Sequence, residues 1–245
     1  MRASVVLPAM NEAGNIGRLV EETYAVVPAD RLLEVIVVDD GSDDSTADEI
    51  KSLINSGQYQ GLRYLRHENR SGQSVALRTG ILAAKSSIIA QMDGDGQNDP
   101  RDLEKLLDLL APPSSSSGTA LVGGIRTSRK GASSKRLASK AANWIRDAVL
   151  RDNCPDTGCG IKVYWRDAFL MLPFFTSVHR YLPALFQTYG YEVAYLPVND
   201  RERMTGQSKY SNLVRALVGL YDLMGVSWLR RRSRKPNVVE DMHSD

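Results

Sequence analysis

Two aspartates, Asp93 and Asp95, stand two positions apart in the segment "IIAQMDGDGQNDP" at residues 88–100. Side chains alternate between faces in an extended chain, so both carboxylates point to the same side. Like charges that close destabilise a site unless a cation lies between them. Mg²⁺ or Mn²⁺ takes one or two carboxylates together with substrate phosphate oxygens and water. The pair therefore suggests a divalent metal site, although an isolated pair of this kind fits a solvated turn equally well.

Further polar turns support the metal interpretation. "PAMNE" follows an apolar run at residues 4–7, and "DDGSDDS" follows another at residues 34–40. Ligands bind at the carboxyl ends of the strands in parallel sheets, so we expect the three turns to share one edge. Gly94 and Gly96 would let a ligand approach the backbone closely. Together the turns predict a site for a nucleotide and a divalent metal.

Short apolar, β-branched runs alternate with longer helical patterns along the chain. Strands are predicted at residues 4–7, 34–40, 62–67, 87–93, 120–126, 161–165 and 192–198. Helices are predicted at residues 12–26, 44–55, 72–85 and 100–110, the last with Asp99 as its N-cap and Pro100 in its first turn. This order predicts an α/β fold of the Rossmann-like kind, with a mostly parallel sheet flanked by helices.

Composition narrows the class of protein. The 245 residues suit one α/β domain with appendages, and a net charge of +2 gives no sign of a nucleic-acid partner. Cys154 and Cys159 have no second pair with which to form a metal knuckle, so we interpret both as reduced thiols in a cytoplasmic protein. Charges interrupt the apolar segment 213–229, which falls short of the roughly 20 apolar residues of a spanning helix.

The sequence resembles family-2 glycosyltransferases of the GT-A fold, and among them the dolichol-phosphate mannosyltransferase-like, polyprenyl-phosphate glycosyltransferases. The motifs that carry this resemblance are "VVLPAMNEAGNI", "VIVVDDGSDDST", "NRSGQSVALRTGI", "MDGDGQNDP", "DTGCGIKVYWRD" and "RERMTGQSKY". They span most of residues 4–210 and are highly specific as an ordered set. We accordingly expect a catalytic domain at residues 1–210 and a C-terminal amphipathic helix with a basic, flexible tail at residues 211–245.

The resemblance implies positions for the site residues. It places Pro8, Met10 and Glu12 beside the nucleotide, Val38 and Asp40 around its base and ribose, Asp93, Gly94, Asp95 and Gln97 at the metal and diphosphate, Arg126 near the phosphates, and Arg203 and Lys209 across the diphosphate. Asp95, Asp156 and Arg203 are the residues expected to carry catalysis. Asp156 lies in "DTGCG", where inverting relatives often carry an acid on the acceptor side.

The implied reaction is inverting and metal-dependent. A sugar would pass from a GDP- or UDP-sugar to a polyprenyl phosphate, with Mg²⁺ or Mn²⁺ as the cofactor. A phosphomonoester has its second pKa at about 6, so it is already an anionic nucleophile at neutral pH and needs no strong base. Asp156 is then expected to position the acceptor.

Two other functions remain open. One is transfer to a sugar or protein hydroxyl, and the other is a catalytically silent, nucleotide-binding peripheral membrane protein. A nucleotidyltransferase is disfavoured because "PAMNEAGNIG" lacks the basic residues of an early glycine-rich phosphate loop.

Other polar residues have structural interpretations. Asp43, Asp44 and Asp48 suit the first turn of a helix. His67 and His179 are interpreted as structural or acceptor-side polar residues. Arg70 and Arg78 fit either charges on a helix surface or contacts to the phosphate of an acceptor.

Two segments suggest conformational and membrane roles. The basic loop at residues 127–135 is expected to close as a lid over phosphates. In residues 211–229, Leu213, Leu217, Leu220, Leu223, Met224 and Trp228 recur at spacings of three and four, followed by "LRRRSRKP". This helix either packs on the core or lies at the interface of an anionic membrane, which would bring the enzyme to the cytoplasmic face.

Overall fold

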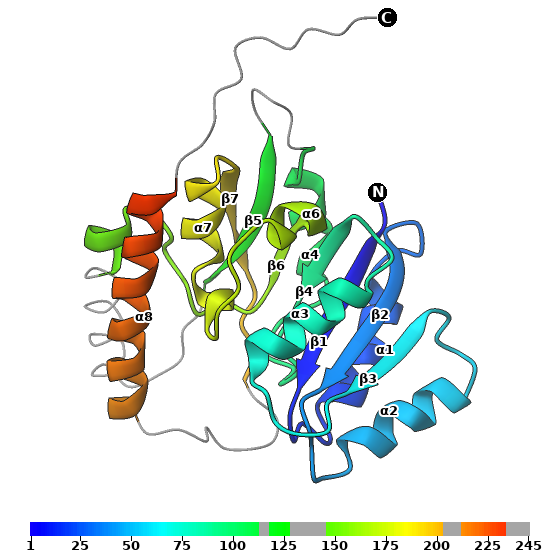
Figure 1. The fold of residues 1–245 in the computed structure, drawn as a ribbon. Coiled ribbons are helices and arrows are strands. Elements are labelled where there is room, and N and C mark those ends of the chain that lie inside the picture. Colours follow the sequence, from blue (N-terminus) through cyan, green and yellow to red (C-terminus); the bar gives the residue numbers. More distant parts are fainter. Residues whose placement is uncertain (113–117, 128–145, 203–211, 234–245) are drawn as a thin grey trace, which may run out of the picture.

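The computed structural model describes residues 1–112, 118–127, 146–202 and 212–233, and the side chains of residues 212–218 lie outside that description. Its centre is a seven-stranded sheet with the order β3-β2-β1-β4-β6-β5-β7 (Figure 1). The strands are β1 Ala3–Ala9, β2 Leu32–Asp39, β3 Leu62–Arg66, β4 Ile88–Gln91, β5 Thr119–Arg126, β6 Lys162–Trp165 and β7 Glu192–Val198. Only β6 runs antiparallel to its neighbours within this sheet. The predicted mostly parallel α/β sheet is confirmed.

Helices connect the strands in the predicted rhythm. They are α1 Ile16–Val26, α2 Thr46–Asn55, α3 Gln73–Ala83, α4 Asp102–Leu109, α6 Arg166–Leu170, the 3₁₀ helix η1 Val178–Arg180, α7 Leu182–Thr188 and α8 Asn212–Arg232. Residues 146–150 are also helical. In the described part of the chain, no helix combines the length and apolar character needed to cross a membrane.

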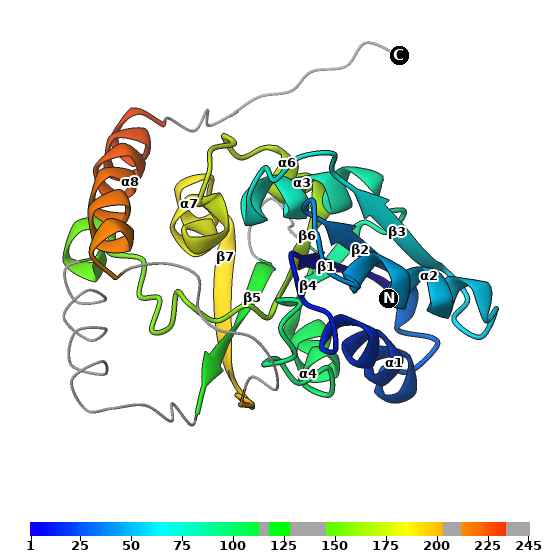
Figure 2. The same ribbon diagram turned by 90° about the horizontal axis from the view of Figure 1, so that it is seen from below.

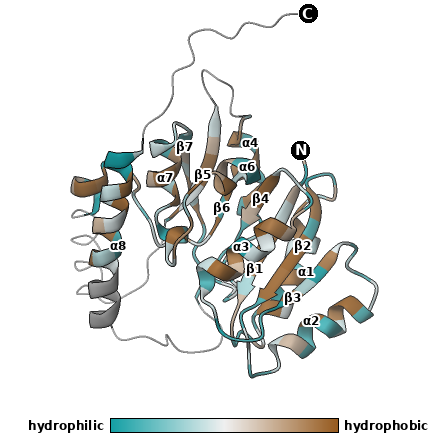
Figure 3. Ribbon diagram, in the orientation of Figure 1, coloured by the Kyte–Doolittle hydropathy of each residue, from teal (hydrophilic) through white to brown (hydrophobic). Residues whose placement is uncertain are grey.

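The period-two pattern of the central strands divides the core between the two faces of the sheet. Val5 and Leu7 of β1 join the cluster under α1, α2 and α4, whereas Val6 between them joins the cluster under α3, α6 and α7. Figure 2 shows α1 and α4 on one side of the sheet, with α3, α6 and α7 on the other. Strands buried on both faces read as continuous apolar runs, and in Figure 3 brown predominates in the central strands.

The start of α4 differs from the prediction. Asp99 was expected as the N-cap, but the helix begins at Asp102 and its N-cap is Arg101. Asp99 instead accepts a hydrogen bond from the backbone N–H of Arg101 at 3.0 Å, in the turn that precedes the helix. Aspartate side chains commonly bond the backbone two residues on, and here that turn competes with helical capping.

One side of helix α8 packs on α7. Leu223 and Val226 are buried in the core cluster beneath α7. Arg230 Nε donates to Thr188 Oγ1 at 2.9 Å, and Tyr181 Oη donates to the Gly219 carbonyl at 3.1 Å. The predicted helix is therefore present, and part of its apolar surface is used for packing on the protein core.

Glu34 is a buried charge that ties four chain segments together at one end of the sheet. Its side chain in β2 is only 2% exposed. It accepts hydrogen bonds from Ser4 Oγ at 2.7 Å, Arg63 Nη1 at 2.8 Å and the Lys85 backbone N–H at 2.6 Å. Burial alone would raise the pKa of Glu34, but the bonds from Arg63, Lys85 and Ser4 outweigh burial and hold the pKa below its ordinary value.

Replacing Glu34 by Gln should destabilise the fold, because an amide cannot accept from all three donors and leaves Arg63 without its carboxylate. We expect a loss of about 1–3 kcal/mol in the free energy of unfolding at pH 7, measured by urea denaturation. A carboxylate with a lowered folded pKa stabilises above its unfolded pKa, so the difference from wild type should shrink as the pH falls below 4.5. The exposed Glu192→Gln variant is the control, and equal unfolding of all three proteins would contradict this role.

Candidate active site

The turns that follow β1, β2 and β4 meet at one edge of the sheet, as the three parallel strands require. The first two turns are fastened to each other: the backbone N–H of Asn11 donates to Ser42 Oγ at 2.9 Å, and that of Glu12 donates to Thr46 Oγ1 at 2.9 Å. The side chains of Asn11 and Asp43 also bond, with Asn11 Nδ2 donating to Asp43 Oδ1 at 2.5 Å. These contacts build one rigid rim.

Most acids of the second turn serve this rim. Asp44 accepts from the backbone N–H of Thr46, the first residue of α2, at 3.0 Å and from that of Ala13 at 3.2 Å. Glu49 accepts from the backbone N–H of Gly14 at 2.6 Å. The prediction that Asp44 serves the start of a helix is confirmed. Asp43 has a structural role in the same rim, since it accepts the hydrogen bond from Asn11.

Asp40 fixes the start of α3. It is 3% exposed, and its two oxygens accept from the backbone N–H groups of Ser71 at 2.8 Å and Gly72 at 2.7 Å. His67 bonds Asp40 through Nδ1 at 2.8 Å and Thr79 Oγ1 through Nε2 at 2.9 Å, which confirms its structural interpretation. In this structure the carboxylate of Asp40 is held by protein groups, and its predicted place beside the ribose remains a prediction.

Asp93 and Asp95 follow β4 and are both half-buried, and Asp95 Oδ1 accepts from the backbone N–H of Gln97 at 3.1 Å. Asp93 keeps some exposed surface, but burial raises its pKa to about 6, helped by the nearby charge of Asp95. Lys162, Arg126 and a hydrogen bond of 2.7 Å from Gln73 Nε2 to Asp93 Oδ1 act in the opposite direction. Without a cation the two carboxylates destabilise each other, and this is the electrostatic condition that a bound divalent metal relieves.

Two glycines let the backbone crowd around this pair. A Cβ on Gly160 would lie 2.3 Å from Asp93 Oδ2 and 2.8 Å from Asn98 Oδ1, which itself accepts from the Asp93 backbone N–H at 3.0 Å. A Cβ on Gly94 would lie 2.7 Å from the Pro8 carbonyl oxygen. Gly94 was expected to admit a ligand, and the structure adds that it admits the end of β1.

Gln97 is held next to the segment that follows β7. The backbone N–H of Arg201 donates to the Gln97 carbonyl at 2.9 Å, and Gln97 Nε2 donates back to the Arg201 carbonyl at 3.3 Å. Arg201, which the sequence analysis did not single out, also pairs with Asp99 and Glu22 at 2.6 Å each. Arg201 therefore lies beside the Asp93–Gln97 turn, and Arg203 follows it two positions later in the sequence.

Arg126 and Asp156, predicted separately, form one ion pair. Arg126 Nε donates to Asp156 Oδ2 at 2.7 Å and Nη2 donates to Oδ1 at 2.8 Å, so the pairing is bidentate. The bonds from Arg126 to Asp156 raise the pKa of the guanidinium above its ordinary value. Arg126 ends β5 and Asp156 precedes β6, so the pair lies at the same sheet edge as Asp93 and Asp95.

The other predicted residues fall into three groups. Met10 and Glu12 are partly exposed in the turn after β1. Pro8 is buried, and Val38 is fully buried in the core beneath α3, so a role of Val38 beside the base would belong to its backbone. Arg203 and Lys209 lie outside the described residues.

The predicted lid also lies mainly outside the described residues, at 128–135. Both cysteines are confirmed as free and buried thiols.

Sequence reasoning missed several polar side chains that line a pocket with Asp93, among them Gln73, Lys162 and Arg180. Lys162 carries a signal that could have been used, because it stands in the otherwise apolar run "IKVYW". A lysine inside a buried strand is rare unless it has an anionic partner. Gln73 and Arg180 have no such signal, because long polar residues are ordinary at helix ends.

α/β proteins with a mostly parallel sheet bind ligands at the carboxyl ends of the strands, and the aspartate pair after β4 lies at that edge. Residues 4–170 match the model of Glycosyl transferase family 2, and the chain belongs to that family.

Two relatives match most of its length. The dodecaprenyl-phosphate galacturonate synthase of Rhizobium johnstonii is 30% identical over 96% of this chain and 69% of its own length. The undecaprenyl-phosphate 4-deoxy-4-formamido-L-arabinose transferase of Pectobacterium carotovorum is 29% identical over 90% of this chain and 66% of its own length. This chain thus spans about two thirds of the length of these relatives.

Solved structures show the same fold. The glucosyl-3-phosphoglycerate synthase of Mycobacterium tuberculosis, in complex with Mn²⁺, UDP and glucosyl-3-phosphoglycerate, superposes with a TM-score of 0.67 at 22% identity. The match covers 94% of this chain and 79% of that enzyme. The predicted GT-A fold is confirmed by this likeness.

Adding a single methyl group at Gly160 should disable the site without unfolding it, because the new Cβ would displace the Asp93 carboxylate. We expect Gly160→Ala to weaken binding of UDP with Mn²⁺ by about tenfold or more, an effect of ~1.4 kcal/mol, measured by calorimetry. Gly219→Ala is the matched control, since a Cβ there meets nothing within 4 Å. Wild-type affinity in a folded Gly160→Ala protein would show that Asp93 does not need its present position.

Proposed function

We propose that this glycosyltransferase moves a sugar, with inversion, from a nucleoside diphosphate to a polyprenyl phosphate. The observation that carries the proposal is the pair Asp93 and Asp95 at the carboxyl edge of β4. The two carboxylates repel each other, and a bound cation would relieve that repulsion. Support for the acceptor comes from relatives that are named for dodecaprenyl and undecaprenyl phosphate. Support for a uridine donor, rather than a guanosine donor, comes from the UDP bound by the structural neighbour.

The donor set fits Mg²⁺ or Mn²⁺. In the described part of the chain, no three or more His, Cys, Asp or Glu side chains are grouped to hold a metal. Two carboxylates with the amide of Gln97 suit a hard cation whose remaining ligands are water and diphosphate oxygens. When bound, the cation neutralises charge that develops on the departing diphosphate. Arg203 and Lys209 are proposed to act on the same diphosphate from the other side.

The ion pair with Arg126 favours a positioning role for Asp156. Both oxygens of Asp156 already accept bonds from Arg126, so this carboxylate is a poor candidate for taking a proton from an acceptor. A phosphate acceptor needs no such proton transfer. Its oxygen forms the new bond to the anomeric carbon as the bond to the nucleoside diphosphate breaks. The positive charge of Arg126 stabilises the negative charge of the phosphate groups nearby.

A hydroxyl acceptor is the second candidate. It would require a general base, and Asp156 would have to leave Arg126 to serve. Transfer from UDP-sugars to farnesyl phosphate but not to farnesol would favour the phosphate. The reverse result would favour the hydroxyl, and UDP binding without turnover on either acceptor would favour the silent nucleotide-binding protein.

Removing one metal carboxylate should abolish transfer, because Asp93 alone cannot hold the cation against the diphosphate. We expect Asp95→Ala to remain folded and to lose activity by about a thousandfold, the scale of one strong transition-state interaction. Excess EDTA should stop the wild-type enzyme, and Mn²⁺ or Mg²⁺ should restore it. The control is Asp48→Ala, an exposed acid of α2. Full turnover in chelator would exclude the metal role.

Membrane contact is proposed for the outer side of α8. Among its described side chains, Tyr221 is 76% exposed, Trp228 is 60% exposed, and Leu220 and Met224 are also exposed. Apolar grooves of about 320 and 440 Å³ flank Trp228. The run Arg230–Arg232 follows at the C-terminal end of the helix, which is teal in Figure 3. An apolar side with cations at its end suits an anionic lipid surface on the cytoplasmic face, near a lipid-linked acceptor.

Polar substitutions on that side should release the protein from membranes. We expect Met224→Gln with Trp228→Gln, and separately Arg231→Gln with Arg232→Gln, to lower co-sedimentation with vesicles that contain anionic phospholipid. The two arginines should contribute roughly 1 kcal/mol each near the surface, and binding should weaken with salt. Leu82→Gln, at an exposed leucine of α3, is the control. Equal sedimentation of all variants would exclude α8 as the membrane contact.

A further inference from the structure

A polar pocket adjoins Asp93 on the side away from the nucleotide rim. It has a volume of about 340 Å³ and is lined by the loop 157–160, Gln73, Asp93, Lys162, His179 and Arg180. In the sheet, β1 and β2 lie on one side of β4, and β6 lies on the other. Because β6 is antiparallel, its first residue, Lys162, pairs with Gln91 at the end of β4. The pocket thus lies across Asp93 from the turns that follow β1 and β2.

Lys162 is a buried cation with spare hydrogen-bond donors. It is 4% exposed, and its ammonium donates to the Cys159 carbonyl. Within the described residues, no carboxylate lies within ion-pair distance of that ammonium. An ammonium has three donors, and burying one is costly unless an anion compensates it. The nearby charge of Asp93 gives partial compensation, but that carboxylate is the one expected to hold the metal.

The rest of the pocket is also suited to an anion. Arg180, at the end of η1, brings a second cation to the lining. His179 bonds Ser74 Oγ through Nδ1 at 2.7 Å, and burial lowers the pKa of His179 to about 3, so its ring is neutral at physiological pH. Gln73 is the first residue of α3, and the positive end of that helix dipole therefore lies at the same place.

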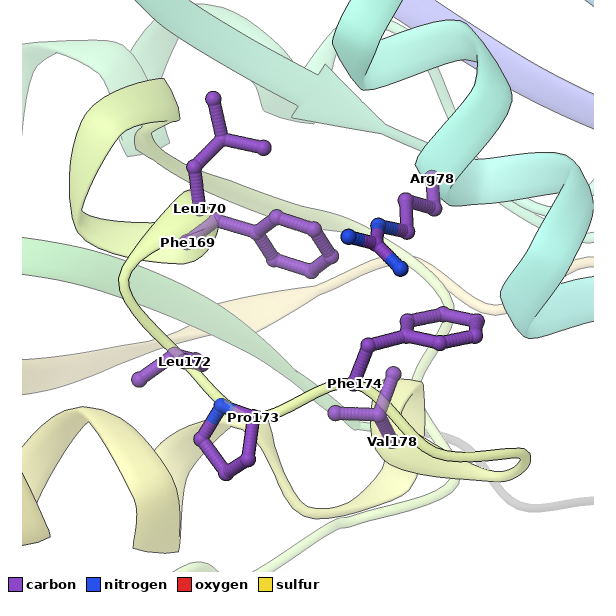
Figure 4. A pocket seen from close by; sticks show the side chains of 7 residues that line it. All are labelled: Arg78, Phe169, Leu170, Leu172, Pro173, Phe174 and Val178. Atoms are coloured by element: carbon purple, nitrogen blue, oxygen red, sulfur yellow. The ribbon is translucent and has the colours of Figure 1, made fainter.

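The segment that carries Arg180 is anchored to α3 at two points one helical turn apart. Ser74 holds His179, and the guanidinium of Arg78 lies 4.5 Å from the centre of the Phe174 ring. Figure 4 shows this guanidinium over Phe174 and pointing toward Phe169. The structure thereby favours a packing role for Arg78 over a direct contact with an acceptor. These two contacts hold the pocket wall in place.

We propose that Lys162 and Arg180 bind the phosphate of the acceptor and position it for attack across Asp93. This inference rests on the proposed function, since it assigns the acceptor subsite of the same reaction. The two cations would offset the negative charge of the phosphate, which Asp93 and Asp95 would otherwise repel. Gln73, already bonded to Asp93, fixes the wall between the metal side and the acceptor side.

Calorimetry with farnesyl phosphate, in the presence of UDP and Mn²⁺, tests the subsite without requiring turnover. Wild type should bind farnesyl phosphate and not farnesol. Lys162→Met and Arg180→Gln should each weaken binding by about tenfold or more, the usual effect of losing a charge-assisted hydrogen bond. Lys162→Arg should retain most of the affinity for farnesyl phosphate. Arg180→Gln should bind UDP with Mn²⁺ as wild type does, and Lys162→Met should lose less affinity for UDP with Mn²⁺ than for farnesyl phosphate, because Lys162 also lies near the Asp93 carboxylate. Lys51→Met, at an exposed lysine of α2, is the control.

Several results would overturn the inference. These are unchanged farnesyl phosphate binding by folded Lys162→Met, no binding by wild type, or an equal loss of UDP–Mn²⁺ affinity, which would assign the pocket to the donor. The two proposals fail separately. If Lys162 binds the phosphate but no UDP-sugar is transferred to it, the proposed reaction is wrong and the subsite stands. If Lys162→Met transfers the sugar with wild-type KM and kcat, the subsite is wrong and the reaction stands.

Discussion

The repulsion between Asp93 and Asp95 is the constraint around which this end of the molecule is arranged. Burial and the neighbouring carboxylate both raise the pKa of Asp93, and the protein opposes them with Lys162, Arg126 and Gln73. These three side chains come from β6, β5 and α3, so three separate elements are committed to one carboxylate. Such a site retains an ionisable acid ready for a cation, at the expense of local stability.

The other acids at this edge have structural partners. Asp40 holds the start of α3, Asp44 holds the start of α2, and Asp156 is paired with Arg126. Hydrogen bonds from backbone N–H groups or from a guanidinium stabilise an ionised carboxylate. Asp93 and Asp95 also accept hydrogen bonds, from Gln73 Nε2 at 2.7 Å and from the Gln97 backbone N–H at 3.1 Å. They differ from the rim acids because the charge of Asp95 raises the pKa of Asp93.

The sequence predicted the strands, the sheet edge and the aspartate pair because these depend on local patterns. The alternation of Val5, Val6 and Leu7 between the two core clusters follows from the period of a strand, and the shared edge follows from parallel order. It did not predict that Arg126 pairs with Asp156, or that Lys162 reaches the Asp93 pocket. Those contacts join residues distant in the chain, and they depend on β6 running antiparallel between β4 and β5. No residue in β6 signals that direction.

The order of the strands also divides the molecule into two sides. The elements β1, β2 and α2 lie on one side of β4, while β6, β5, α7 and α8 lie on the other (Figures 1 and 2). Helix η1, which brings Arg180 to the pocket, contacts α7, and α7 contacts α8. If α8 lies on a lipid surface, as proposed, an acceptor anchored in that surface approaches from the side of the molecule that carries Lys162 and Arg180. The donor then enters from the solvent over β1 and β2. On the proposed function, β6 and its neighbours would hold a lipid-anchored acceptor on one side of Asp93 and Asp95, and the turns after β1 and β2 would hold a water-soluble donor on the other.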